Sequence, residues 1–218
     1  MENSSQKKLI VFGATGGTGS HILQQSLEQG YLVTAFVRNP EKITVSHENL
    51  AIVQGDVLNP LAVEKAVNGH DIVLCAIGSP VNKIGVVRSQ GTHNIIRAME
   101  KAGVKRLICQ TSLGYGDSVA LLKQTPFIFR NIIVPFLLKK GFADHALQES
   151  YIKESKLDWV IVRPGNLTDG PLTGNYQHGF PATQKKLEVK VSRADVAHFI
   201  LRQIDSNVYL RMTPGLSY

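Results

Sequence analysis

Four glycines within seven residues are the densest chemical signal of this sequence: Gly13, Gly16, Gly17 and Gly19. An apolar, β-branched run precedes them and a helical pattern follows, so they fall at a strand-to-helix turn. Backbone without side chains can turn sharply there and approach a phosphate closely. The unpaired N–H groups and the positive dipole end of the following helix would face that phosphate. The pattern predicts a dinucleotide site; the alternative is a turn that only packs a helix on a sheet.

The residues inside the turn and after the second strand-like run are the first predicted cofactor contacts. Thr15 and Thr18 lie within the glycine turn. The second run ends at Arg38, where sites that prefer NAD usually carry an acid that binds the ribose hydroxyls. A guanidinium suits a 2′-phosphate instead, and Lys42 would assist it. We therefore predict NADP(H) in preference to NAD(H), with a solvated strand end as the alternative role of Arg38.

Two further strand ends supply predicted contacts with the adenosine half of the cofactor. Asp56 and Val57 follow the third run, where the carboxylate would accept from the adenine amino group and the valine would pack on the ring. A turn or an N-cap before the helix at Pro60 is the alternative role of Asp56. Ile77 and Gly78 lie in the segment Ala76–Ser79 at the end of the fourth run, where small residues would let the adenosine ribose and the linker to nicotinamide pass close to the backbone.

Six strand-like runs alternate with helical patterns along most of the chain, and they must position these residues. The predicted strands are Lys8–Phe12, Leu32–Val37, Leu50–Gln54, Ile72–Ala76, Arg106–Gln110 and Trp159–Arg163. The predicted helices are about Thr18–Gln29, Pro60–Val67, Ser89–Ala102 and Asp144–Ser155. Alternation of this kind is typical of an α/β protein with a Rossmann-like, doubly wound parallel sheet. We expect one domain over residues 1–218.

The last part of the chain departs from that alternation. Residues 164–181 are rich in Gly, Pro, Thr and Asn and are predicted to form a long loop. Ser192 then has the character of an N-cap for a helix that runs to about Ile204, and Val208–Met212 is predicted to be a final strand. Because ligands bind outside the carboxyl ends of parallel strands, residues from about 164 to 218 should cover the cofactor edge and complete the substrate side.

The composition excludes several classes of partner. The net charge of +7 is spread evenly, with 11 Lys/Arg against 8 Asp/Glu in residues 1–109 and 13 against 9 in residues 110–218, so no basic stripe for nucleic acid is expected. The histidines are scattered without metal-ligand spacing, so we expect no metal. No apolar run is long enough to span a membrane, and the polar N-terminus lacks a signal-peptide core. With Cys75 and Cys109 in buried runs, we expect a cytoplasmic protein without a disulfide.

The chain resembles the atypical, NmrA-like short-chain dehydrogenases/reductases, and within them most closely the biliverdin reductase B and flavin reductase group. The segments that carry the resemblance span nearly the whole chain: the glycine turn, Arg38, Gly55–Val57, Thr111–Ser112, Arg163–Gly165, Pro171–Gly174 and Val191–Phe199. The resemblance implies an NADPH-dependent reductase that passes hydride to flavins or linear tetrapyrroles. It also favours a monomer.

The resemblance implies roles for particular residues on the nicotinamide side. Ser112 would lie beside the nicotinamide, and His145 would approach the nicotinamide ribose; these two are the predicted catalytic residues. Pro164 and Asn166 fall in the segment that would line the same half of the cofactor. A second histidine of the related enzymes is replaced here by Asn166, which favours a flavin or a quinone over a tetrapyrrole.

The tyrosines exclude the usual short-chain dehydrogenase mechanism. That mechanism uses a tyrosine whose pKa is lowered by a lysine four residues further on, and none of Tyr31, Tyr115, Tyr151, Tyr176 and Tyr209 has that lysine. A flavin or quinone delocalises the charge of the incoming hydride and takes its proton from water, so the protein needs chiefly to orient donor and acceptor. Ser112 would then orient the nicotinamide or donate to the acceptor, unless it only bonds local backbone.

Three questions stay open at the level of sequence. A non-catalytic NADP(H) sensor that acts through a protein partner, as in NmrA-type regulators, is the alternative to a reductase. A nucleotide-sugar or steroid-modifying enzyme is a weaker alternative because the catalytic tyrosine is missing. The apolar segment 126–138 would form a lid over a planar acceptor, ordinary core, or a membrane-surface or partner-binding segment.

Overall fold

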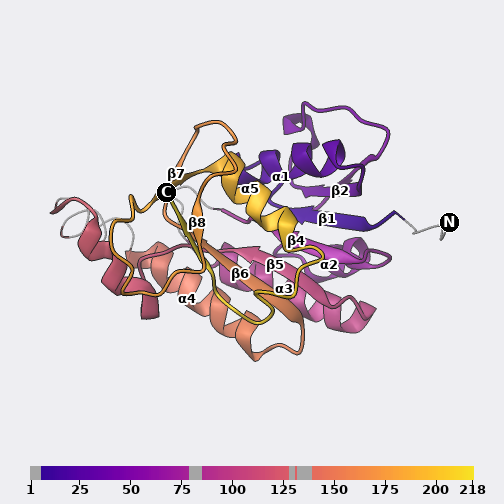
Figure 1. Ribbon diagram of the computed structural model, residues 1–218. Coiled ribbons are helices and arrows are strands. Elements are labelled where there is room, and N and C mark those ends of the chain that lie inside the picture. The colour runs from indigo at the N-terminus through magenta and orange to yellow at the C-terminus, as the bar shows by residue number, and fades with distance from the viewer. Residues whose placement is uncertain (1–5, 79–84, 128–130, 132–138) are drawn as a thin grey trace.

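The computed structural model describes residues 6–78, 85–127, 131 and 139–218, and its centre is a twisted, mostly parallel sheet (Figure 1). Within the described residues the sheet has eight strands in the order β3-β2-β1-β4-β5-β6-β10-β8. All neighbours pair in parallel except β8, which is antiparallel to β10. The strands are β1 (Lys8–Phe12), β2 (Leu32–Val37), β3 (Leu50–Gln54), β4 (Ile72–Cys75), β5 (Arg106–Gln110), β6 (Asp158–Pro164), β8 (Gln177–His178) and β10 (Gly215–Ser217). The predicted Rossmann-like α/β fold is confirmed.

Helices cover both faces of this sheet. The helices α1 (Gly17–Glu28) and α5 (Arg193–Arg202) lie on one face, and α2 (Pro60–Val67), α3 (Val87–Ala102) and α4 (Lys139–Glu154) lie on the other (Figure 1). The strands between two helix layers are apolar on both sides, as parallel strands usually are. In β1, Leu9 packs in the same core cluster as Ile22 of α1, and the next residue, Ile10, packs with Ile95 of α3.

The strand order reverses beside β1, and this reversal creates the crevice in which the site lies. From β1 the sheet runs outward through β2 and β3 on one side and through β4, β5 and β6 on the other. The connections that leave β1 and β4 therefore diverge to opposite faces. In open α/β sheets the gap between such connections, at the carboxyl ends of the strands, is where ligands bind.

Most predicted element bounds are confirmed. The bounds of β1, β2, β3, β5 and α2 are those predicted, β4 is one residue shorter, and β6 is one residue longer at each end. Two helices begin earlier than predicted, because α3 starts at Val87 and α4 at Lys139. A 3₁₀ segment, Gly116–Gln124, was not predicted at all. It follows directly on the predicted active-site residues at the end of β5.

The predicted final strand Val208–Met212 is wrong. The chain turns there, Arg211 has a positive φ of 56°, and the only strand-like pairing in this stretch of described residues is an isolated bridge from Met212 to Val160. A left-handed residue ends any extended run, so the last strand is β10 instead. There Gly215 lies opposite Arg163 of β6.

The predicted loop 164–181 contains strand structure that composition did not reveal. Besides β8, it includes β7 (Asn166–Thr168), which pairs in parallel with β9 (Lys190–Ser192). The predicted cap of α5 is confirmed, since the Ser192 hydroxyl oxygen accepts from the Asp195 N–H at 3.0 Å. Most of the apolar segment 126–138 lies outside the described residues, so its role as a lid stays a prediction.

Three observations bear on the predicted partners. Cys75 and Cys109 are free and buried, as expected. Among the described residues, no group of three or more His, Cys, Asp or Glu side chains is placed to hold a metal ion. No helix in the described part of the chain has the length and apolar character needed to cross a membrane.

Candidate functional site

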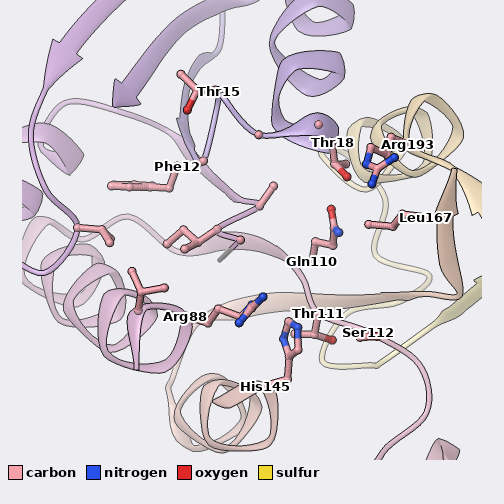
Figure 2. Close-up of a pocket in the computed structure, with 18 of the residues that line it drawn as sticks. Phe12, Thr15, Thr18, Arg88, Gln110, Thr111, Ser112, His145, Leu167 and Arg193 are labelled. Carbon is pink, nitrogen blue, oxygen red and sulfur yellow. The ribbon is translucent and has the colours of Figure 1, made fainter. Parts of the chain in front are cut away.

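A cleft of about 470 Å³ opens at the carboxyl ends of β1, β4, β5 and β6 (Figure 2). Its size is in the range of small-molecule and cofactor sites. Most of the predicted site residues line it, although they come from seven separate parts of the sequence. These residues are Gly13, Thr15, Gly16, Gly17, Thr18, Arg38, Val57, Ile77, Gly78, Ser112, His145 and Pro164.

The glycine turn forms the floor of the cleft and leaves no room for side chains. Gly13 has a φ of +87°, and a Cβ there would lie 2.4 Å from the carbonyl oxygen of Ala76 in the adjacent connection. A Cβ on Gly19 would lie 2.0 Å from the carbonyl oxygen of Gly13. Gly19 does not line the cleft itself, and its role is to let α1 start directly against the turn. The N-cap Gly16 provides no side-chain cap, so the first N–H groups of α1 face the cleft. This bare cradle fits a dinucleotide pyrophosphate.

The end of the cleft next to β2 and β3 matches the predicted adenosine side. Phe36, Arg38 and Val57 line it, and Arg38 is exposed. Asp56 does not line the cleft: its Oδ1 accepts from the Leu58 N–H at 2.9 Å. The alternative interpretation of Asp56 as a turn residue is thereby confirmed, whereas the N-cap of α2 is Asn59. The contact of Asp56 with adenine stays a prediction.

His145 stands at the opposite end of the cleft, on α4, and it is held in one tautomer. Its Nδ1 lies 3.0 Å from Oε1 of Gln148. The Gln148 amide nitrogen donates to the Thr92 hydroxyl at 2.9 Å and to the Cys109 sulfur at 3.3 Å, so Oε1 is the oxygen that accepts. Nδ1 therefore carries the ring proton, and Nε2 remains an acceptor.

The His145 ring is neutral over the physiological range. Burial, and after it the positive charge of Arg88, lower the pKa of His145 to about 4. Arg88 opens α3 and lines the same part of the cleft, where its guanidinium lies 3.6 Å from the carboxylate of Asp144. A neutral His145 with Nε2 free of a proton can accept a bond from a sugar hydroxyl. It cannot act as a general acid near neutral pH.

Ser112 lies at the end of β5 beside His145, as predicted (Figure 2). Its hydroxyl donates to the carbonyl oxygen of its neighbour Leu113 at 3.0 Å. The local backbone bond that was the alternative for Ser112 is thus present, together with a position in the cleft. With this rotamer the Ser112 oxygen offers lone pairs to a ligand, and it can donate to a ligand only if the hydroxyl rotates.

A buried polar cluster lies directly behind these two residues. The Oε1 atom of Glu149 accepts from the hydroxyls of Thr111, at 2.8 Å, and of Tyr115, at 2.5 Å. The Tyr115 ring stacks on the His145 ring with an interplanar angle of 11°. Burial, followed by the charge and hydrogen bond of Glu149, raises the pKa of Tyr115. Tyr115 therefore supports the His145 ring from behind the cleft and is not a proton donor.

Asn166 does not line the cleft. It lies on β7, where its backbone N–H donates to the carbonyl oxygen of Val189. The segment it belongs to still contributes to the site, because Pro164, Gly165 and Leu167 line the cleft on both sides of it. Asn166 itself is exposed, at the first position of β7.

Several lining residues were not found from the sequence. The most consequential are two arginines, Arg88 and Arg193, which approach the cleft from opposite sides (Figure 2). Phe36, Val87, Gln110, Thr111 and Leu167 are further examples. Strand-end position was a usable signal for Gln110 and Thr111. The two arginines open helices that are far from the glycine turn in the sequence, so only their packing reveals them.

The fold and the site together define a Rossmann-type dinucleotide-binding protein. A family model described as NAD(P)H-binding matches residues 13–207, so the chain belongs to that NAD(P)H-binding family, of the atypical short-chain dehydrogenase/reductase kind. The match confirms the predicted dinucleotide site in general terms.

Individual relatives extend the comparison. A chloroplastic protein of Arabidopsis thaliana, At2g34460, described as uncharacterized, is 36% identical over 78% of this chain, and the match spans 62% of its own length. The photosystem II assembly factor Ycf39 of Synechocystis is 24% identical over 94% of this chain and 61% of its length. Among solved structures, the anaerobillin reductase ChuY of Escherichia coli O157:H7 has a TM-score of 0.77 at 26% identity, with 96% of each chain covered. This chain thus spans about three fifths of these two curated relatives.

Proposed function

We propose that the protein is an NADPH-dependent reductase that transfers hydride to a flavin, a quinone or a similar planar acceptor. The observation that carries this proposal is the chemistry of the acceptor end of the cleft. There the neutral His145 uses its one ring N–H in a hydrogen bond to Gln148. Behind it, the Tyr115 hydroxyl donates a hydrogen bond to Glu149. Side chains that orient but do not protonate suit an acceptor that delocalises the incoming charge.

The parts of the cleft have distinct roles in this proposal. When bound, NADPH supplies the hydride. The glycine turn and the start of α1 bind the pyrophosphate through backbone N–H groups, and Arg38 binds the 2′-phosphate. His145 accepts from a hydroxyl of the nicotinamide ribose through Nε2, and Ser112 orients the ring that carries the hydride. The proton of the reduced acceptor comes from water.

Two further expectations belong to the same proposal. The enzyme is proposed to act as a monomer, which the family resemblance favours. The two buried cysteines are free thiols, which supports a cytoplasmic location.

The second candidate is a non-catalytic NADP(H) sensor that acts through a protein partner. One comparison favours it, since the relative Ycf39 is named an assembly factor and not a reductase. The local bond of the Ser112 hydroxyl to Leu113 is also compatible with a site that binds without turnover.

The deciding experiment measures oxidation of NADPH with riboflavin, FMN, biliverdin and a small quinone offered in turn, together with NADPH binding by calorimetry. Turnover with one acceptor that falls in Ser112→Ala, but not in the control Ser150→Ala on α4, supports the reductase. Tight NADPH binding without turnover for any acceptor contradicts the reductase and favours the sensor.

A further inference from the structure

Arg193 occupies an electrostatically unfavourable position at the cleft. It is the first residue of α5, and it lines the cleft beside Gly17 and Thr18, at the first turn of α1 (Figure 2). Its positive charge therefore lies near the N-terminal ends of two helices, where the helix dipoles disfavour a cation. The first turn of α1 has no acidic residue, and its N-cap has no side-chain bond. An anion between Arg193 and α1 would stabilise both.

The packing of Arg193 also explains a glycine that the phosphate turn does not require. A Cβ built on Gly17 would lie 2.6 Å from Cδ and 2.7 Å from Nε of Arg193. The arginine stem thus fills the space where a side chain at position 17 would be. A Cβ on Gly13 or Gly19 would meet backbone atoms, whereas a Cβ on Gly17 would meet the Arg193 side chain, which therefore lies directly against the first residue of α1.

Asp169 is the only ion-pair partner of Arg193 in the described part of the chain, and it neutralises the charge poorly. The Arg193 Nη1 lies 2.5 Å from Oδ1 of Asp169, but the Asp169 side chain is 90% exposed whereas that of Arg193 is 26% exposed. Surface pairs with one freely hydrated partner contribute little stability. The guanidinium has five N–H donors and keeps several of them for a ligand in the cleft.

We infer that Arg193 binds the pyrophosphate of the dinucleotide together with the N–H groups at the start of α1, against which its side chain packs. A planar fork of donors suits two neighbouring phosphate oxygens, and the loop that carries Asp169 would release part of Arg193 when the anion enters. This inference rests on the dinucleotide site of the proposed function and not on the identity of the acceptor. It differs from the role of Arg38, which lies at the adenosine end and faces the 2′-phosphate.

Three ligands distinguish a contact with the pyrophosphate from a contact with the 2′-phosphate. NADP⁺ carries both the pyrophosphate and the 2′-phosphate, NAD⁺ lacks the 2′-phosphate, and 2′-AMP lacks the pyrophosphate. Their dissociation constants are measured by calorimetry with the full-length protein, for wild type, Arg193→Gln, Arg193→Lys and Asp169→Asn. Arg97→Gln on the exposed side of α3 is the matched control, and thermal unfolding checks that each variant is folded.

The expected result for Arg193→Gln is a rise of about tenfold in the dissociation constants of NADP⁺ and NAD⁺, by the same factor for both, with 2′-AMP unchanged. Arg193→Lys, which keeps the charge but not the fork, should show a smaller rise. Asp169→Asn should bind both dinucleotides as tightly as wild type or more tightly, because it frees the guanidinium.

Three outcomes would overturn the inference. Dissociation constants within twofold of wild type for Arg193→Gln would mean that Arg193 makes no contact. Equal weakening by Asp169→Asn would mean that the ion pair only holds the loop. Weakening of 2′-AMP would assign Arg193 to the 2′-phosphate. Failure of the wild type to bind either dinucleotide would instead contradict the proposed function itself.

Discussion

The guanidinium of Arg163 and the carboxylate of Glu149 form a buried, bidentate ion pair, with Nε 2.8 Å from Oε1 and Nη2 2.6 Å from Oε2. The two side chains are 5% and 2% exposed. The pair joins the end of β6 to the middle of α4, and Glu149 also binds Thr111, the residue before Ser112. One carboxylate therefore ties together the strand end, the helix and the wall that surround the predicted catalytic residues.

Replacement of Glu149 by Gln is expected to destabilise the protein. Among the described residues it leaves the buried Arg163 with only the exposed Asp117 as a charged partner, and loss of one partner of a buried pair typically costs about 3–5 kcal/mol. The free energy of unfolding is measured by denaturant titration. Glu154→Gln, at an exposed position of the same helix, should change it by no more than about 0.5 kcal/mol. Similar effects of the two substitutions would mean that the pair adds nothing to stability.

The same carboxylate should govern part of the acid sensitivity. Burial alone would raise the pKa of Glu149, but hydrogen bonds from Arg163, Tyr115 and Lys153 outweigh burial and lower the pKa to about 2. Because the pKa is lower in the folded state, the stability that this group contributes is present above about pH 4.5 and is lost as the pH falls toward about 2. Glu149→Gln should lose less stability than wild type over that window. A parallel loss in both proteins would assign the acid sensitivity to other groups.

His145 is expected to stay neutral down to about pH 4, because burial and the charge of Arg88 both oppose its protonation. Nitrogen-15 NMR of the ring should show the Nδ1–H form at neutral pH. Arg88→Gln removes one of the two causes and should raise the pKa, while Arg97→Gln should not move it. A titration midpoint of the His145 ring near 6.5 in the wild type would show that burial and Arg88 do not lower its pKa.

Arg38→Ala is expected to weaken NADPH binding roughly 10- to 100-fold, as for loss of a charge-assisted bond, and to leave NADH binding unchanged. Dissociation constants for both cofactors provide the measurement, again with Arg97→Ala as the control. Wild-type protein that binds NADH at least as tightly as NADPH would contradict the predicted preference.

The local elements could be predicted because each depends on neighbouring residues. The β-branched runs of β1, β2, β3 and β5 have the observed bounds, and Ser192 caps α5 as its spacing indicated. Val208–Met212 has the same apolar, extended character, yet it turns. Within the described residues its only strand-like pairing is the bridge from Met212 to Val160 of β6, and the carboxyl end of β6 pairs with β10 instead. Pairing partners distant in the chain decided that case.

By itself the sequence determined the parallel sheet, the glycine turn and the dinucleotide site. Strand–helix alternation and a run of glycines that leaves the backbone bare at a phosphate can both be recognised within short contiguous stretches of sequence. Only the tertiary structure decided which charged side chains line the cleft and which lie behind it. Arg88 and Arg193 reach the cleft from helices far apart in the chain, and Glu149 meets Arg163 and Tyr115 behind it. Contacts of this kind depend on how α3, α4 and α5 pack against the sheet. No residue type or spacing within a single segment encodes that packing.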